Sequence, residues 1–461
     1  MMFDLGIEDA TVLTANGRQR FNVYVQDGRF GAFSDTALPA KQVVNGRGLL
    51  MFPGIVDSHV HSRDPGLTHK EDFLHSTKAA AAGGVTTVLE MPNSVPPVID
   101  RTQFLARRAD LQAKATVDFG LWGMVISEST DQDIRELVDC GVCAFKLFWG
   151  YALDRNTRAL VYVPEEGQAV IAPPDNGRVL ELFALLASAG KVLAIHAEDN
   201  AIIALRTQRG YVGDDPVDRL LWERPVVAEA ATIALATEFS RVTGCSVHIV
   251  HMSSAVGVDI VQQAHSQGMD ITAETCPQYV ALTAEDVKEL GPVAKVYPPI
   301  RHETDRRALI AGLRAGTVSF VASDHAPHSS VEKRLPFSEA PAGFAGVQTL
   351  FPVLLDMALR GELSLDLLPR ILSTHPARRY GLLGKKGDVQ VGYDADFVLV
   401  DANSTTTWTR EHLYSLSPEN PWMDRTLKGA LRATYLRGQL VAEDGHIVAQ
   451  GKGQFVSPGP R

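Results

Sequence analysis

The sequence predicts an α/β fold, a (β/α)₈ TIM-type barrel with a small β-sandwich domain formed by both chain ends. Short apolar runs alternate with helix-like stretches through the middle of the chain, and hairpin patterns occur near both ends. The 461 residues exceed what one core normally needs and accommodate a barrel of about 250 to 350 residues with a smaller domain. We expect the small domain at residues 1–50 and 376–461, and the barrel at residues 51–375.

The two chain ends share a pattern of short strands joined by tight turns. "FNVYVQDGRFGAF" holds two alternating runs around Asp27-Gly28, and "LRATYLRGQLVAEDGHIVA" has a second turn at Asp444-Gly445. Asp-Gly between alternating apolar residues is a strong hairpin signal. We therefore expect the two ends to meet in one β-domain.

The middle of the chain contains eight short apolar runs that we interpret as parallel strands. Helix-like stretches separate many of them, such as the Ala-rich "DFLHSTKAAAAGG", which glycine closes. Strand-helix alternation repeated eight times predicts the barrel. The runs lie at residues 54–58, 85–91, 117–123, 142–148, 192–198, 246–253, 270–276 and 318–325.

Composition and charge exclude several classes of protein. Apolar residues make up 45% of the chain and charged residues 21%, as in globular proteins generally. The net charge of -10 lacks the basic balance of a nucleic-acid binder. No signal peptide is recognisable, and no window approaches the roughly 18 apolar residues of a membrane span. We expect a cytoplasmic protein whose partners include neither nucleic acid nor a membrane.

The four cysteines are too few and too scattered for a disulfide framework. Cys140 and Cys143 form a single C-x-x-C without a second pair. We expect them to pack at a helix end, in preference to a redox role.

Ionisable residues gather where the apolar runs stop. In "FPGIVDSHVHSRDPG" an apolar lead-in ends in His59 and His61, which alternation places on one face of the strand. In a barrel of this kind the catalytic groups lie at the carboxyl ends of the strands. The residues at the other strand ends are Lys146, His196, His251 and Asp324.

Four imidazoles and a carboxylate at one barrel mouth are good ligands for zinc. Each alone has a simpler explanation, because His196 or His251 by itself is more often a hydrogen-bonded core residue than a ligand, and most lysines are exposed. Together they predict a metal site, and the five groups exceed what one tetrahedral ion needs. A cationic Lys146 cannot bind a metal, but a lysine that has taken up carbon dioxide becomes a carbamate, which can bridge two ions.

These segments resemble the cyclic amidohydrolases: dihydroorotase, allantoinase and hydantoinase (dihydropyrimidinase). The similar segments, in family order, are "PGIVDSHVHSRDPG", "AAAAGGVTTVLEMPN", "GVCAFKLF", "AIHAED", "IVHMSS", "ETCPQY", "PPIR" and "SDHAPH". The resemblance implies two Zn²⁺ per chain, held by His59, His61, His196, His251 and Asp324 and bridged by Lys146 as N6-carboxylysine. It also implies a homodimer or homotetramer.

The implied reaction is metal-assisted hydrolysis of a ring amide C–N bond in a cyclic ureide, which gives an N-carbamoyl acid. A hydroxide shared by two ions attacks the ring carbonyl. Asp324 takes the hydroxide proton and delivers it to the departing nitrogen.

The resemblance to dihydroorotases also implies a carboxylate-binding set. It consists of Arg63 after the H-x-H pair, Asn93 in "MPN" and His328 in "DHAPH". An arginine fork matches a carboxylate, and amide and imidazole donors complete the site. The alternative is that Arg63 pairs with Asp64 or Glu71 and has a structural role.

Other residues depart from the dihydroorotase pattern. Gln278 in "CPQY" and Tyr297 before "PPIR" are expected to contact the substrate, and "CPQY" is more typical of hydantoinases. Tyr151 lies where hydantoinases place a tyrosine that hydrogen-bonds the developing oxyanion, or else it packs beside Trp149. Residues 152–178 follow the fourth strand and form either a specificity lid or a surface insertion.

Dihydroorotate, hydrolysed to N-carbamoyl-aspartate, is the first choice of substrate. Allantoin, hydrolysed to allantoate, and a 5-substituted hydantoin are the alternatives. A non-catalytic scaffold would have lost ligands that this chain retains. A single-zinc deaminase of the same barrel superfamily needs no lysine ligand, so Lys146 disfavours it.

Overall fold

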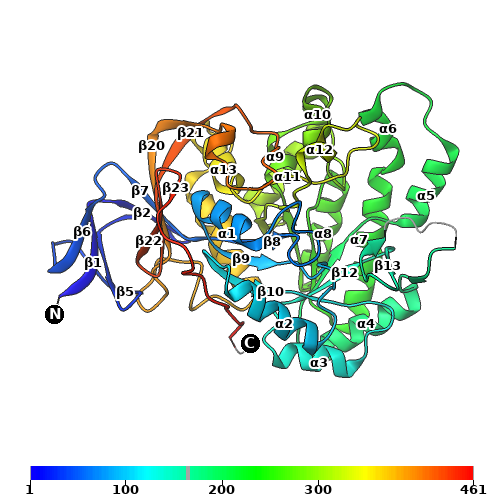
Figure 1. The fold of residues 1–461 in the computed structure, drawn as a ribbon, viewed down its shortest axis with the longest axis horizontal. Coiled ribbons are helices and arrows are strands. Elements are labelled where there is room, and N and C mark those ends of the chain that lie inside the picture. The colour runs from blue at the N-terminus through cyan, green and yellow to red at the C-terminus, as the bar shows by residue number, and fades with distance from the viewer. Residues whose placement is uncertain (1, 162–166, 460–461) are drawn as a thin grey trace.

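The computed structural model describes residues 2–161 and 167–459 and has the expected architecture. Figure 1 shows strands from both chain ends gathered on one side of the molecule and a barrel with its helices on the other. The predicted (β/α)₈ barrel with a β-sandwich built from both ends is confirmed. No helix in this described part of the chain is long and apolar enough to cross a membrane.

All eight predicted runs become barrel strands. The third is interrupted after Leu121, so one piece pairs with the second strand and the other with the fourth. The strands are β8 (Ile55–Val60), β9 (Val85–Glu90), β10 (Asp118–Leu121) with β11 (Gly123–Met124), β12 (Phe145–Phe148), β16 (Leu193–His196), β17 (Val247–Ile249), β18 (Ile271–Thr275) and β19 (Phe320–Val321).

The barrel closes between its first and last strands. Val60 forms a parallel bridge with His325. The backbone N–H of His61 donates to the carbonyl of His325 (2.7 Å), and the N–H of His325 donates to the carbonyl of His59 (3.2 Å). Closure therefore places the H-x-H pair directly beside Asp324.

Helices connect the strands and cover the barrel. The Ala-rich helix α1 begins after Asp72, whose carboxylate accepts from the N–H of His75, and ends at Gly83. The helices are α1 (Phe73–Ala82), α2 (Arg101–Gln112), α3 (Asp131–Asp139), α4 (Asn176–Ser188), α5 (Asn200–Arg209), α6 (Pro216–Glu223), α7 (Val226–Thr243), α8 (Ala255–Ser266), α9 (Pro277–Ala281), α10 (Ala284–Leu290), α11 (Glu303–Ala315), α12 (Ser330–Lys333), α13 (Leu350–Leu359) and α14 (His375–Arg379).

Two sheets form the small β-region. One has the order β5-β4-β1-β6, and the other β23-β22-β21-β20-β7-β2-β3, so residues from both ends share a sheet. The strands are β1 (Phe3–Glu8), β2 (Thr11–Thr14), β3 (Gly17–Arg20), β4 (Asn22–Gln26), β5 (Arg29–Ser34), β6 (Ala40–Asn45), β7 (Leu50–Pro53), β20 (Phe397–Thr407), β21 (Thr426–Leu436), β22 (Gln439–Glu443) and β23 (His446–Ile447). The domain limits at 50/51 and 375/376 stay predictions.

Both predicted hairpins are present. Gln26 pairs with Arg29, and Glu443 pairs with His446. The turn residues Asp27 and Gly28 have φ of 53° and 76°, and Asp444 and Gly445 have φ of 45° and 80°. Positive φ at both central residues favours Asp-Gly. Cys140 caps the end of α3, as expected, and its thiol and that of Cys143 are free.

A buried ionic cluster joins the barrel to the small region. Nζ of Lys386 contacts the carboxylates of Asp118 on β10, Asp394 (2.9 Å) and Asp396 (2.6 Å). Arg437, after β21, also contacts Asp118. Burying three carboxylates is tolerable here because two cations compensate them.

Candidate metal centre

His59 and His61, at the carboxyl end of β8, converge with Asp324. Their Nε2 atoms lie 3.1 Å apart. Oδ1 of Asp324 lies 3.3 Å from Nε2 of His59 and 3.5 Å from Nε2 of His61. Both histidines are buried. Three ligand atoms from the two ends of the barrel sheet are thus directed at one point.

His196, at the end of β16, and His251, just after β17, form a second pair. Nδ1 of His196 lies 2.9 Å from Nε2 of His251. The ring centroids of His59 and His251 are 5.5 Å apart, so the two pairs are neighbours. His251 and Asp324 have φ of 40° and 50°, values uncommon outside glycine that persist where a functional site holds them.

Lys146 lies in β12, between Phe145 and Leu147 of the hydrophobic core. Its side chain is fully buried, and its Nζ has no hydrogen-bond partner within residues 2–161 and 167–459. Burial lowers the pKa of its ammonium to about 8. A lone buried ammonium is unfavourable, so a larger fraction of this amine is uncharged than in an exposed lysine.

Burial also favours the neutral form of three of the imidazoles. It lowers the pKa of His61 to about 4, and it lowers the pKa of His196 and of His251. Neutral imidazole is the form that binds metal. The pKa of Asp324 is lowered by His59 and His61, although burial alone would raise it. The converging histidine nitrogens and the ionised carboxylate have the chemistry to hold a divalent cation.

Each of three histidines donates its outer ring N–H to a side-chain oxygen. Nδ1 of His59 donates to Oε1 of Glu274 (2.6 Å). Nδ1 of His61 donates to Oδ1 of Asn93 (2.7 Å), and Nε2 of His196 donates to Oε2 of Glu198 (3.0 Å). These acceptors leave the lone pair of the other nitrogen directed inward, as outer partners of metal-binding histidines do.

Glu198 and Glu274 were missed as functional residues in the sequence. Both lie in segments already recognised as similar to the family, "AIHAED" and "ETCPQY". The signal available in the sequence was an acidic residue within two positions of a strand end.

Arg63 and His328 meet, as the predicted carboxylate-binding set requires. Nη2 of Arg63 lies 3.3 Å from Nε2 of His328, and Nε of Arg63 donates to the carbonyl of Pro327 (3.1 Å). Asn93 lines a small pocket together with Arg63. Its oxygen is engaged with His61, however, so a substrate can use only its NH₂ group. Asn93 thus has an orienting contact that the sequence did not predict.

The remaining predicted substrate residues lie around the same mouth. Oη of Tyr151 is 3.3 Å from Nε2 of His196. Tyr297 lies under the guanidinium of Arg224, whose Cζ is 3.6 Å from the ring centroid. Gln278 follows β18 and is buried, and neither its Oε1 nor its Nε2 has a hydrogen-bond partner among the described residues. A buried amide of that kind has capacity to bind a ligand.

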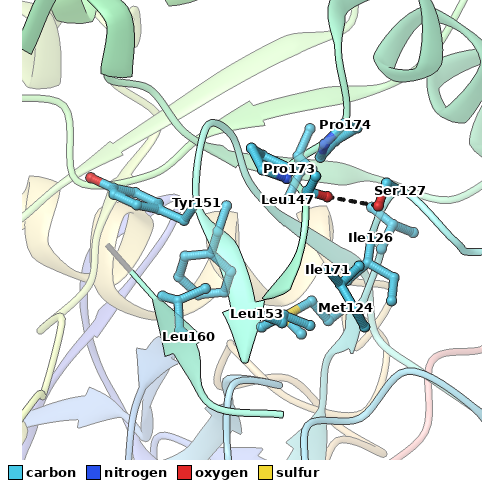
Figure 2. Close-up of a pocket in the computed structure, with 13 residues that line it drawn as sticks. Met124, Ile126, Ser127, Leu147, Tyr151, Leu153, Leu160, Ile171, Pro173 and Pro174 are labelled. Carbon is cyan, nitrogen blue, oxygen red and sulfur yellow. Dashed lines mark hydrogen bonds between the residues drawn. The ribbon is translucent and has the colours of Figure 1, made fainter. Parts of the chain in front are cut away.

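The segment after the fourth strand forms a small sheet of its own, in the order β14-β13-β15. The strands are β13 (Ala152–Asp154), β14 (Leu160–Val161) and β15 (Val170–Ile171), and residues 162–166 of the predicted lid lie outside the described residues. Figure 2 shows an apolar pocket beneath this sheet, with Tyr151 at its edge and the tyrosine hydroxyl directed away from the apolar side chains. A lid function stays a prediction.

Comparisons with known proteins cover nearly the whole chain. A family model described as "Amidohydrolase family" matches residues 50–441. The allantoinase of Deinococcus radiodurans is 34% identical over 465 residues, covering 99% of each chain. The allantoinase of Rubrobacter xylanophilus is 35% identical over 461 residues, covering 99% of this chain and 98% of its own. The L-hydantoinase (dihydropyrimidinase) structure from Arthrobacter aurescens has a TM-score of 0.92 at 30% identity, covering 99% and 100%.

These names correct the order of the substrate predictions. The sequence put dihydroorotate first, on the strength of Arg63, Asn93 and His328. The similar proteins carry the names allantoinase and hydantoinase, and so favour the alternatives. Arg63, Asn93 and His328 stay candidate substrate-binding residues. Asn93 has a second contact, because its oxygen accepts a hydrogen bond from His61.

Proposed function

The chain belongs to the amidohydrolase family and is a hydrolase of cyclic amide C–N bonds, and we propose that it opens the ring of a cyclic ureide. Allantoin is the first candidate substrate, and 5-substituted hydantoins are the second. The similarity to allantoinases over 99% of the chain supports the first choice. The product is an N-carbamoyl acid.

One observation carries the proposal. Two pairs of histidine nitrogens, 3.1 Å and 2.9 Å apart, lie next to a carboxylate and a buried amine without a partner among the described residues. The outer nitrogens of His59 and His61 both donate, so their inner lone pairs face and repel one another, and a cation between them makes that arrangement favourable.

The residues in this centre would hold two zinc ions. His59, His61, His196, His251 and Asp324 supply neutral or anionic ligands. Lys146 would join the ions as a carbamate, because burial favours the uncharged amine that reacts with carbon dioxide. When bound, zinc supplies an activated water and polarises a carbonyl oxygen.

Asp324 would carry the proton. Its carboxylate is ionised at neutral pH, because His59 and His61 lower its pKa. Water adds to the ring carbonyl carbon and gives a proton to Asp324. The ring C–N bond then breaks, and Asp324 passes that proton to the departing nitrogen. The carbonyl carbon becomes the product carboxylate.

The substrate would lie against polar groups that surround the histidines. The amide of Gln278, the NH₂ group of Asn93 and the hydroxyl of Tyr151 offer hydrogen bonds to ring amide and carbonyl groups. Tyr297 would form part of the wall. Donors held in place before binding favour the transition state when they meet developing charge.

The contact between Arg63 and His328 supports dihydroorotate as a third candidate. Lys70 lies 3.3 Å from Nδ1 of His328 and is paired with Glu332 (2.6 Å). Burial and the charges of Arg63 and Lys70 lower the pKa of His328 to about 2, so the imidazole is neutral and acts as a dipole. An acidic group on the substrate would accept a charge-assisted hydrogen bond from Arg63.

The test is a substrate panel with zinc-loaded protein in bicarbonate buffer. Allantoin, several 5-substituted hydantoins and dihydroorotate are compared, and the carbamoyl products are identified by NMR. We expect allantoin to have the highest kcat/KM. Protein stripped by a chelator is the control, and zinc together with bicarbonate restores its activity.

A zinc-loaded protein that opens none of these rings would overturn the proposal. Turnover of dihydroorotate alone would make dihydroorotate the first candidate substrate. A homodimer or homotetramer stays a prediction, which sedimentation measurements test independently.

A further inference from the structure

His196 differs from the other metal-site histidines on its outer side. Its Nε2 lies 3.0 Å from Oε2 of Glu198 and 3.3 Å from Oη of Tyr151. The outer nitrogens of His59 and His61 each have one close side-chain acceptor. The outer nitrogen of His196 therefore faces the hydroxyl of Tyr151, which is also expected to contact the substrate.

Glu198 shares one oxygen between two partners. Oε2 accepts from His196 and from Nη1 of Arg224. The side chain is fully buried, and its Oε1 has no hydrogen-bond partner in the part of the chain that the structure describes. A buried carboxylate with one free oxygen depends strongly on its cation. Arg224 is therefore the group that holds Glu198 where His196 can use it.

Arg224 lies between α6 and α7 and reaches three groups. Its guanidinium contacts Glu198, lies over the ring of Tyr297 with Cζ 3.6 Å from the centroid, and approaches Oη of Tyr151 at 3.5 Å. A planar guanidinium can pair with a carboxylate and stack on an aromatic ring at once, which an ammonium cannot do. The same cation thus touches both tyrosines and the partner of His196.

The backbone at Arg224 is held by a second buried arginine. Nη1 of Arg301, from the "PPIR" segment, donates to the carbonyl of Arg224 (3.1 Å). Nε of Arg301 donates to Oγ of Ser253 (2.9 Å), and Ser253 also contacts Glu229. Arg301 lies 4.0 Å from Glu229. Two buried acids and two buried arginines therefore form one network of balanced charge.

We propose that Arg224 is a positioning residue that couples the metal ligand His196 to the substrate-side tyrosines. Through Glu198 it orients the imidazole so that Nδ1 faces His251. Through its contact over the ring it positions Tyr297, and through Nη1 it positions Tyr151. This coupling rests on the proposed function, because it assigns a substrate role to the tyrosines.

The decisive variants are Glu198→Gln and Arg224→Met. The measurement is zinc affinity, by competition with a graded series of chelators. We expect each variant to lose about 10- to 100-fold in affinity at one of two zinc ions, as when outer partners of ligands are removed. The other ion, beside His59 and His61, should keep its affinity. The control is Arg306→Met, because Arg306 pairs with Glu303 and Glu362 instead of a metal-site group.

A third variant separates the effect of Arg224 on zinc affinity from its effect on substrate binding. Arg224→Lys keeps the positive charge beside Glu198 but loses the contact between the guanidinium and the ring of Tyr297. We expect its zinc affinity to return to within about 3-fold of the wild type, while KM remains raised by about 10-fold. A residue that served stability alone would not divide its effects between zinc affinity and KM in this way.

The proposal is overturned if Glu198→Gln and Arg224→Met fold and bind both zinc ions as the wild type does. If Arg224→Met fails to fold, the nearly isosteric Glu198→Gln decides by its zinc affinity, and Arg224→Lys decides by KM. If the wild type opens no cyclic ureide although Glu198→Gln lowers the affinity for one zinc ion, the substrate assignment fails and the positioning of His196 stands.

Discussion

The variant Lys146→Met separates the destabilisation caused by burying an amine from the proposed role of that amine in the metal bridge. In the absence of metal and carbon dioxide, burial lowers the pKa of Lys146 from 10.5 to about 8. At about 1.4 kcal/mol per pKa unit, the buried ammonium destabilises the folded protein by about 3 kcal/mol. Met fills a similar volume without a charge. The metal-free variant should therefore be more stable than the metal-free wild type at pH 7.

The pH dependence follows from the same shift. Because the folded-state pKa lies below the unfolded value, the penalty is complete below pH 8 and fades as the pH rises from 8 to 10.5. The advantage of Lys146→Met should shrink over that range. Zinc with bicarbonate should reverse the order, because only the wild type would form the bridge and gain stability from binding.

The assay is denaturant unfolding of both proteins between pH 6.5 and 9.5, with and without zinc and bicarbonate. Lys288→Met, at a partly exposed lysine that pairs with Asp218 on the surface, is the control for loss of a charge. The reasoning is refuted if metal-free Lys146→Met is no more stable than the wild type and zinc stabilises both equally. Activity of the loaded variant should fall at least about 1,000-fold, since the bridged centre supplies several kcal/mol.

Three further changes test other parts of the structure. Arg63→Ala should raise KM for an acidic substrate about 10- to 100-fold, the value of a charge-assisted hydrogen bond, with under about 3-fold effect for neutral allantoin; equal effects on both would contradict an anion site. Gln278→Leu should leave the denaturation midpoint unchanged or higher, since both side-chain polar atoms lack partners among the described residues, but raise KM about 10-fold; unchanged KM would argue against substrate contact. Lys386→Met should lower the free energy of unfolding by about 3 to 5 kcal/mol, because it leaves buried carboxylates without enough positive charge beside them, while the folded fraction keeps its zinc content. A loss below about 1 kcal/mol in urea unfolding would show that Arg437 alone compensates the carboxylates.

The barrel could be predicted because its signals are local. Eight apolar runs with helical stretches between them are visible without any contact information, and each became a strand within a few residues of its expected place. The Asp-Gly turns at residues 27 and 444 were equally predictable, because positive φ at both turn positions is a property of those residue types. What the runs did not reveal is the break after Leu121, where the third strand changes its pairing partner.

The candidate site was predictable as a set of residues but not as a set of contacts. The rule that functional groups gather at strand ends identified the histidines, Lys146 and Asp324. It carried no information on Arg224, which lies on a connection between helices. The resemblance to dihydroorotases assigned Asn93 to the substrate alone, although its oxygen contacts His61.

By itself the sequence determined the strand order, the side of the barrel on which the ionisable groups lie, and the turns of the small sheets, because periodicity and turn chemistry act between near neighbours. Only the tertiary structure decided which nitrogen of each histidine faces inward. His59 takes its orientation from Glu274, 215 residues away, and His196 takes its orientation from a carboxylate whose counter-ion reaches Tyr297. Such choices depend on hydrogen bonds between side chains that folding alone brings together, so no local pattern encodes them.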